Sequence, residues 1–362
     1  KQLSKTLNNS FKTMESQNKM PYRYLGNTGL QVSAISLGFA DATDQQTLNQ
    51  IIKRAFELGI NCFDCAEGYG DDGSVETLLG NALKALNVGR DEYVISTKIF
   101  FGKGVYKSAK PNQRGLSRKH LIEGTKASLK RLQLEYVDVL SAHRYDPNTP
   151  MEEIVRGFDY LVNNGYAFYW GTSEWSADKI QEAFTICEKY NLVKPVTEQP
   201  EYSMLVRERF EKEYANLFRD YKYGSTIWSP LAGGILTGKY NKEIPKDSRG
   251  GHPLLSYSLI DKLSPESIGE TRRITIALEK IAQELGTSSA GLALAWTLKN
   301  ADVSTAIIGA SKLTYLEDNV AKTLVALDKL TPEVEQRIEE ILKNKPVLTD
   351  GGRLEKSGKS RR

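Results

Sequence analysis

The sequence predicts an α/β protein built as a closed (β/α)8 TIM barrel, with a β-hairpin before the barrel and one extra helix after it. From residue 33 onward, short β-rich runs alternate with longer segments of helical periodicity. This alternation repeats eight times, and no break in composition divides the chain into two domains. The alternative is a doubly wound open sheet, which normally uses about six strands and adds a second domain. Eight units favour the barrel.

The expected strands are short runs rich in β-branched and aromatic residues. They are residues 34–37, 60–63, 93–96, 137–141, 168–171, 196–198, 225–228 and 304–308. Between and after them, apolar residues recur with helical spacing. This pattern predicts helices near 44–58, 74–86, 117–132, 151–163, 176–190, 207–219, 270–299 and 312–324.

Two further elements flank the barrel. Residues 22–33 form a hairpin pattern, with Asn27-Thr28-Gly29 as a turn that tolerates positive φ, and this hairpin would close the lower end of the barrel. Residues 331–343 form another amphipathic helix, which opens with Thr331 as N-cap and Pro332 at the first helical position. The barrel domain therefore spans residues 21–346, between polar basic tails at 1–20 and 347–362 that we expect to be disordered.

Composition excludes several classes of function. The chain has 362 residues and a net charge of +4, but residues 1–20 contribute +3 and residues 351–362 contribute +4. The remainder is net negative at −3, so we expect no nucleic-acid binding. No run approaches the roughly 18 apolar residues of a membrane span, and the N-terminal stretch lacks the apolar region of a secretory signal. We expect a cytoplasmic protein without direct membrane insertion.

The three cysteines do not predict a disulfide framework or a metal site. Cys62 and Cys65 have C-x-x-C spacing, but on a strand residues i and i+3 point to opposite faces. No second pair supplies the other ligands of a structural zinc site. We interpret the cysteines as buried structural thiols.

A G-x-G-x-x-G pattern raises the question of a Rossmann phosphate loop. It follows a β-rich run and is formed by Gly68, Gly70 and Gly73. In a Rossmann loop the first glycine follows the strand directly, and the pyrophosphate lies against bare backbone N–H groups. Here three carboxylates would repel it, and no lysine or arginine between residues 64 and 80 compensates for Glu67, Asp71 and Asp72. We reject the phosphate-loop interpretation.

Polar side chains stand instead at three successive strand ends. Asp64 ends one β-rich run, Lys98 ends the next, His143 follows the one after it, and Tyr69 lies on the loop after Asp64. The carboxyl ends of barrel strands meet at one mouth, where TIM-barrel enzymes place their active sites. The four groups should therefore converge. His120, in the first turn of a helix, and His252, in a Gly-rich loop, are interpreted as structural.

These residues, with long ordered motifs around them, resemble the aldo-keto reductases, and most closely the branch containing the β-subunits of voltage-gated potassium channels. The likeness covers nearly all of residues 22–346. The motifs are RGLSRKHLIEG at 114–124, LQLEYVDVL at 132–140, DPNTPMEE at 146–153, YWGTSEWS at 169–176, WSPLAGGILTGKY at 228–240 and IIGAS at 307–311. The resemblance implies that the four groups are a catalytic tetrad, namely Asp64, Tyr69, Lys98 and His143.

The tetrad suits reduction of an aldehyde or ketone by NADPH. An unperturbed tyrosine has a pKa of about 10 and is too weak an acid. A neighbouring ammonium lowers that pKa, so we expect Lys98 to activate Tyr69 as proton donor. Asp64 would hold Lys98 in place, and His143 would orient the carbonyl oxygen.

The cofactor site rests partly on the residues and partly on the resemblance. Trp228, at the end of a β-rich run, offers a flat face for the nicotinamide, with core packing as the alternative. The resemblance implies that Ser173 and Gln199 bind the carboxamide. It also implies contacts to the pyrophosphate and the 2′-phosphate by Ser229, Pro230, Leu231, Gly233, Lys239 and Arg249, and contacts to the adenosine end by Gly309, Ser311, Tyr315, Asp318 and Asn319. A helix N-terminus near Lys239 and Arg249 favours NADP over NAD.

The chain departs from the family pattern at three places. His143 stands where many channel β-subunits carry Asn, and is more like the active reductases and plant relatives. Glu174 stands where other members carry Arg or Asn, and the loop at residues 39–44 is shorter than in the animal channel subunits. No cofactor contact is therefore carried over to Glu174 or to that loop.

Two functions follow from the resemblance. The first is an NADPH-dependent reductase of small carbonyl substrates. The second is a regulatory subunit that uses bound NADPH as a redox sensor while docked on a membrane channel. The channel-type relatives assemble as fourfold rings, which implies a homotetramer. The basic N-terminal tail is either a pore-plugging segment or an ordinary disordered extension.

Overall fold

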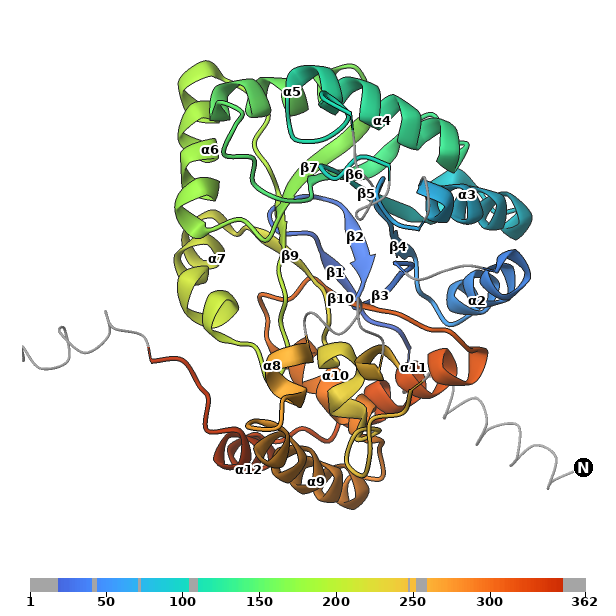
Figure 1. Ribbon diagram of the computed structural model, residues 1–362, viewed down its shortest axis with the longest axis vertical. Helices are drawn as coiled ribbons and strands as arrows, with labels where there is room; N and C mark the ends of the chain where they lie inside the picture. The colour runs from blue at the N-terminus through green and yellow to red at the C-terminus, as the bar shows by residue number, and fades with distance from the viewer. Residues whose placement is uncertain are drawn as a thin grey trace, which may run out of the picture.

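The computed structural model describes residues 19–40, 44–70, 73–103, 110–246, 248–251 and 259–347. Within these ranges eight parallel strands close into a barrel in the order β10-β3-β4-β5-β6-β7-β8-β9, and helices surround it (Figure 1). The predicted (β/α)8 barrel is confirmed. The two predicted tails lie almost entirely outside the described residues.

The barrel strands lie within a few residues of their expected positions. They are β3 Ile35–Gly38, β4 Cys62–Asp64, β5 Val94–Ile99, β6 Val137–Ala142, β7 Ala167–Ser173, β8 Thr197–Gln199, β9 Gly224–Ile227 and β10 Thr305–Ile308. β10 closes the barrel because Ile307 pairs with Ser36 of β3 while Ala306 pairs with Ile227 of β9. Most strand residues are buried, as parallel strands covered by helices require.

The helices that cover the barrel alternate with its strands. They are α2 Gln45–Glu57, α3 Ser74–Leu86, α4 Arg118–Leu132, α5 Met151–Asn163, α6 Ala177–Tyr190, α7 Ala215–Tyr221, α10 Ser289–Lys299 and α11 Leu313–Leu327. Outside this ring, the short α8 Ile260–Leu263 precedes α9 Ile268–Glu284, and α9 packs against both α10 and the C-terminal α12 Pro332–Leu342 (Figure 1). The predicted C-terminal helix is therefore confirmed, with Thr331 as its N-cap.

Two of the predicted helices are corrected by the structure. The single helix expected at 270–299 is two helices, because Gly286 adopts φ +68 and Ser288 then caps α10 by accepting a hydrogen bond from the Gly291 N–H at 3.1 Å. The helix expected at 207–219 is a π-helical turn, Arg209–Glu213, followed by the shorter α7.

The predicted hairpin closes the N-terminal end of the barrel. Strands β1 Tyr22–Tyr24 and β2 Gln31–Ser33 pair antiparallel, and Val32 packs against Cys62 and Val94, the first residues of β4 and β5. The positive φ of the turn falls on Gly26 at +58 rather than on the predicted Asn27-Thr28-Gly29. A Cβ at this position would lie 2.5 Å from the Gly224 nitrogen, so glycine allows the turn to touch β9.

The three cysteines are free and buried. Burial raises the pKa of the Cys62 and Cys187 thiols to about 12, and raises that of Cys65 well above its usual range. These thiols therefore stay protonated and unreactive at neutral pH, as the interpretation of structural cysteines requires.

Candidate active site

A buried ion pair lies at the C-terminal mouth of the barrel. Lys98 Nζ of β5 lies 2.6 Å from Asp64 Oδ2 of β4, and it also donates to the Cys65 carbonyl oxygen at 2.7 Å. The side chains are 0% and 5% exposed, respectively. Parallel pairing of β4 with β5 sets this contact, because Asp64 lies opposite Ser96 and Lys98 follows two residues later on the same face.

Lys98 keeps its charge in this environment. Burial alone lowers the pKa of Lys98, but the attraction of Asp64 and of Tyr69 outweighs burial, so the pKa of Lys98 is raised. The ammonium is therefore present at neutral pH and has a fixed position, since it has two short hydrogen bonds to separate acceptors.

Tyr69 lies beside this ammonium. Its hydroxyl is 3.4 Å from Lys98 Nζ, and its ring centroid is 5.0 Å from the same atom. Gly70, which follows at φ +68, turns the chain at the rim. Burial raises the pKa of Tyr69 above its ordinary value, and the Lys98 ammonium offsets only part of this shift. The expectation of a net lowered pKa is therefore wrong for this structure, because burial is the larger effect.

His143 completes the cluster from the end of β6. Its ring stands edge-to-face with Tyr69 at 5.7 Å and with Phe101 at 4.9 Å between centroids. Burial, with the nearby charges of Lys98 and Arg144, holds the pKa of His143 well below its usual range. The imidazole is therefore neutral at neutral pH. Its buried Nδ1 finds no hydrogen-bond partner within the described residues.

The four predicted catalytic side chains thus come together at one mouth. A neutral imidazole carries one N–H donor, and a protonated phenol carries one O–H donor. Both lie beside a fixed ammonium that stabilises negative charge on the phenol oxygen. Chemically, the arrangement can bind a polar oxygen atom and deliver a proton to it.

Two predicted carboxamide-binding residues lie next to the tetrad. Gln199 at the end of β8 donates from Nε2 to Asp64 Oδ1 at 3.1 Å and to Thr226 Oγ1 at 3.3 Å. Ser173 at the end of β7 donates from Oγ to the Gln199 carbonyl oxygen at 3.0 Å. Both side chains therefore have fixed places at the same mouth.

Trp228 follows β9 and is partly exposed, unlike the other three tryptophans, which are buried. Its indole Nε1 donates to Glu174 Oε1 at 2.8 Å. This partial exposure favours the predicted platform over packing in the core. No role was predicted for Glu174, although an acidic residue directly after a barrel strand is a usable signal.

Residues 229–239, which we call the cradle, form a tightly turning segment beyond Trp228. Ser229, Gly233 and Gly234 have φ values of +55, +61 and +95. A Cβ at Gly234 would lie 2.6 Å from Lys239 Nζ, so the lysine amine lies directly over a glycine backbone. No carboxylate in the described ranges pairs with Lys239. Its nitrogen also lies 5.0 Å from the centroid of the Tyr240 ring. An ammonium without a carboxylate partner among the described residues is suited to a phosphate group.

The remaining predicted contacts lie at the start of α11 or outside the described side chains. Gly309 has no atom within 4 Å of the position that a Cβ would take, which leaves its backbone open. Ser311, Tyr315 and Asp318 are exposed, whereas Asn319 is buried. The backbone of Arg249 lies in the short helix Arg249–Gly251, but its side chain is outside the described part.

Glu67, one of the carboxylates on the glycine-rich loop, is buried. This carboxylate turns inward, where Oε1 accepts from the backbone N–H groups of Phe100 at 2.7 Å and Gly102 at 2.9 Å. The same atom lies 3.0 Å from His120 Nε2, so His120 is a buried structural partner, as expected. Asp71, Asp72 and His252 lie outside the described residues.

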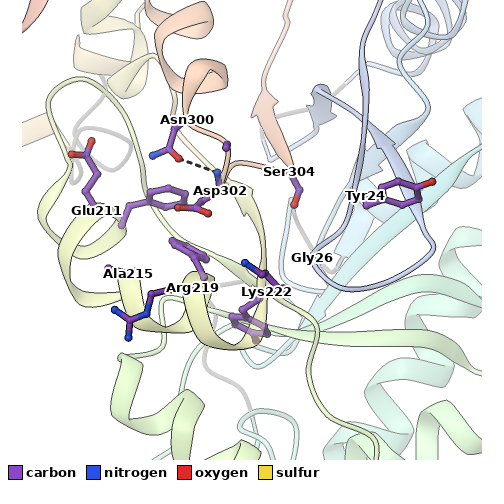
Figure 2. Close-up of a pocket in the computed structure, with 13 residues that line it drawn as sticks. Tyr24, Gly26, Glu211, Ala215, Arg219, Lys222, Asn300, Asp302 and Ser304 are labelled. Atoms are coloured by element: carbon purple, nitrogen blue, oxygen red, sulfur yellow. Dashed lines mark hydrogen bonds between the residues drawn. The ribbon is translucent and has the colours of Figure 1, made fainter. Parts of the chain in front are cut away.

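A pocket of about 380 Å³ lies at the opposite, N-terminal end of the barrel (Figure 2). Its walls come from the hairpin, from α7 and the residues after it, and from the connection between α10 and β10. There the Asp302 N–H donates to Asn300 Oδ1 at 2.9 Å (Figure 2). None of the tetrad residues lines this pocket, so it is not the candidate active site.

The fold and the mouth together define a barrel with a buried lysine, a buried histidine and a partly buried tyrosine, which are placed to bind a polar oxygen atom and protonate it. A model of the aldo/keto reductase family matches residues 34–343, and the chain belongs to this family. Aldo/keto reductases generally use a nicotinamide cofactor, so membership supports an oxidoreductase. The predicted resemblance is confirmed at this level.

Three relatives show which branch of the family is similar. A putative voltage-gated potassium channel subunit beta of Schizosaccharomyces pombe is 50% identical, over 91% of this chain and 95% of the relative. Probable voltage-gated potassium channel subunits beta of Arabidopsis thaliana and Oryza sativa subsp. japonica are 44% and 42% identical, over 90% and 92% of this chain and 98% and 100% of the relatives. Within the described ranges, no helix has the length and apolar character needed to cross a membrane.

Proposed function

We propose that the protein is an NADPH-dependent reductase that converts aldehydes or ketones to alcohols, with Tyr69 as proton donor. The observation that carries this proposal is the convergence of Tyr69, Lys98 and His143 on one mouth, with Lys98 held at 2.6 Å by Asp64. Each group is in the protonation state that carbonyl reduction needs: a phenol, an ammonium and a neutral imidazole.

In this proposal the substrate oxygen binds to the Tyr69 hydroxyl and to an N–H of His143. NADPH, when bound, supplies the hydride that reduces the carbonyl carbon. As negative charge develops on the oxygen, the Tyr69 proton moves to it and leaves a phenolate. Lys98 stabilises that phenolate, and Asp64 keeps the ammonium in position throughout. Burial raises the pKa of Tyr69, so the phenol keeps its proton before the reaction, and proton transfer depends on the negative charge that hydride addition places on the substrate oxygen.

NADP is proposed over NAD because of the cradle at residues 229–239. Lys239 lies over the Gly234 backbone and lacks a carboxylate partner among the described side chains. We assign it to the 2′-phosphate, the group that NADPH carries and NADH lacks, so Lys239→Ala should reduce the preference for NADPH over NADH. An unchanged preference would contradict this assignment.

The test of the reductase is NADPH oxidation with 4-nitrobenzaldehyde, followed by absorbance. Wild type should turn over, whereas Tyr69→Phe should lose turnover by a factor of at least about 100, which is typical of a lost acid catalyst, and should keep NADPH binding. Tyr24→Phe is the matched control, because Tyr24 is 60% exposed on the hairpin at the other end of the barrel. Equal turnover in wild type and Tyr69→Phe would refute the assigned role.

The second candidate function is a regulatory subunit of a membrane channel that uses bound NADPH as a redox sensor. The observation that favours it is the printed description of the three relatives as potassium channel subunits beta. This proposal includes a cytoplasmic location and assembly as a homotetramer. No turnover in wild type, tight retention of NADPH, a tetrameric mass and co-purification with a channel would support it over the reductase.

A further inference from the structure

One carboxylate joins three loops at the mouth of the barrel. Glu174 follows the last residue of β7, and its Oε1 accepts from the Glu201 N–H at 2.6 Å, on the chain after β8. The same Oε1 accepts from Trp228 Nε1 at 2.8 Å, on the chain after β9. Oε2 accepts from Arg209 Nη1 at 2.7 Å. The side chain is 19% exposed, so these bonds are partly shielded from water.

The backbone of Glu174 is adapted to this arrangement. Its φ is +58, in the left-handed region that residues with a Cβ seldom adopt. This turn sends the carboxylate sideways across the ends of β8 and β9 instead of outward. A backbone in a sparsely populated region next to a candidate site is a reason to look for a functional contact.

The contact that matters is the one to Trp228. An indole has a single N–H donor, and fixing that donor fixes the rotation of the ring. Trp228 is partly exposed, so fewer packing contacts restrain its ring than restrain the buried Trp170 and Trp175. The hydrogen bond to a charged acceptor is therefore the main specific restraint on the partly exposed indole.

We propose that Glu174 is a positioning residue that holds the Trp228 indole as the platform for the nicotinamide ring, without touching the cofactor itself. The proposal rests on the proposed function, because it takes Trp228 as the stacking surface. It predicts that Glu174 influences cofactor affinity only through Trp228. If Glu174 acted only through its contacts with Glu201 and Arg209, its removal would lower cofactor affinity by the same factor whichever residue stood at position 228.

A double-mutant cycle separates these two roles. The variants are Glu174→Ala, Trp228→Phe and their combination, with the NADPH dissociation constant as readout. In the wild-type background, Glu174→Ala should raise the dissociation constant about tenfold, which corresponds to about 1.4 kcal/mol. In the Trp228→Phe background, the same substitution should raise it less than about twofold. Equal factors in both backgrounds would overturn the proposal.

A measurement without cofactor keeps this inference separate from the proposed function. The near-ultraviolet circular dichroism difference between wild type and Trp228→Phe gives the signal of the ordered indole. Glu174→Ala should abolish most of that difference. Glu188→Ala should preserve it, since Glu188 forms an exposed ion pair with Lys194 on the outer side of the barrel. An unchanged signal in Glu174→Ala would refute the positioning role. Failure of wild type to bind NADPH would instead refute the proposed function and the nicotinamide platform with it, but not the restraint of the indole by Glu174.

The conservative variant Glu174→Gln covers the case in which Glu174→Ala does not fold. Its amide oxygen can still accept from Trp228, but as a neutral and weaker acceptor. Its effects should therefore have the same pattern at smaller size: a partial loss of the indole signal, and a raised dissociation constant only where residue 228 is tryptophan. A full loss of NADPH binding in both backgrounds would contradict the proposal.

Discussion

Removing the Lys98 ammonium should lower the stability of the fold as well as the catalytic rate. Lys98→Met keeps the length of the side chain but leaves the Asp64 carboxylate, 5% exposed, with Gln199 Nε2 at 3.1 Å as its remaining side-chain partner among the described residues. Breaking a buried ion pair by removing one partner typically costs about 3–5 kcal/mol. We expect a loss of this size in the free energy of unfolding.

The companion variant Asp64→Asn tests whether that cost is electrostatic. On its own, Asp64→Asn should also lower the free energy of unfolding, because the buried Lys98 ammonium loses its counter-charge. The ammonium keeps the neutral Cys65 carbonyl oxygen, at 2.7 Å, as an acceptor. The double variant Asp64→Asn/Lys98→Met carries neither charge. Its loss should fall short of the sum of the single losses by at least about 2 kcal/mol, a coupling expected of contacting residues.

The assay is urea unfolding of the four proteins, followed by circular dichroism. Lys179→Met is the matched control, because Lys179 pairs with Glu182 at 2.8 Å on the surface, where the side chains are 32% and 43% exposed. Such a pair contributes less than about 1 kcal/mol. Additive losses from the two single variants, or a Lys98→Met loss no larger than that of the control, would refute the account of a buried, coupled pair.

Three other predictions follow from buried or close-packed groups. Burial raises the pKa of Glu198 to about 8, above its unfolded value of 4.5. Between these values the folded chain holds a proton that the unfolded chain has released, so the free energy of unfolding should fall as pH rises. Urea unfolding across this range should show a weaker pH dependence in Glu198→Gln, and an unchanged dependence would contradict the prediction. Gly26→Ala should cost more stability than Gly165→Ala, because both have positive φ but only Gly26 has a backbone atom 2.5 Å from the new Cβ; equal thermal midpoints would exclude the close approach. Burial and the charges of Lys98 and Arg144 hold His143 neutral, so His143 should not titrate between about pH 6 and about pH 8. The pH–rate profiles of wild type and His143→Asn should therefore have the same shape over this range, and a rise or fall in rate that disappears in His143→Asn would contradict this.

Much of the barrel follows from local patterns in the sequence. The alternation of strand and helix periods is local, and eight repeats determine which strand follows which. Asp64, Lys98 and His143 could be placed at one mouth because parallel strands share a direction. The convergence of these three residues could therefore be predicted from the topology and the positions of the strand ends alone.

Other features depend on contacts between distant parts of the chain. Gly26 needs its glycine because it touches Gly224, which no local turn rule reveals. The hydrogen bond from Trp228 to Glu174 depends on an unusual φ at Glu174. The net pKa direction of Tyr69 required knowing how deeply the phenol is buried, since burial and Lys98 act in opposite directions. The break at Gly286 had a local signal in the following Thr287 and Ser288, which was outweighed by the helical periodicity around it.

The most direct measurement of the central claim follows the hydride and the proton donor together. Wild type is supplied with NADPH deuterated at the transferable position of C4 and with 4-nitrobenzaldehyde, and the alcohol product is examined by mass spectrometry. The proposed chemistry predicts deuterium on the alcohol carbon in wild type, and almost no labelled alcohol from Tyr69→Phe that still binds the cofactor. Unlabelled alcohol from wild type, or equal yields of labelled alcohol from both proteins, would contradict it.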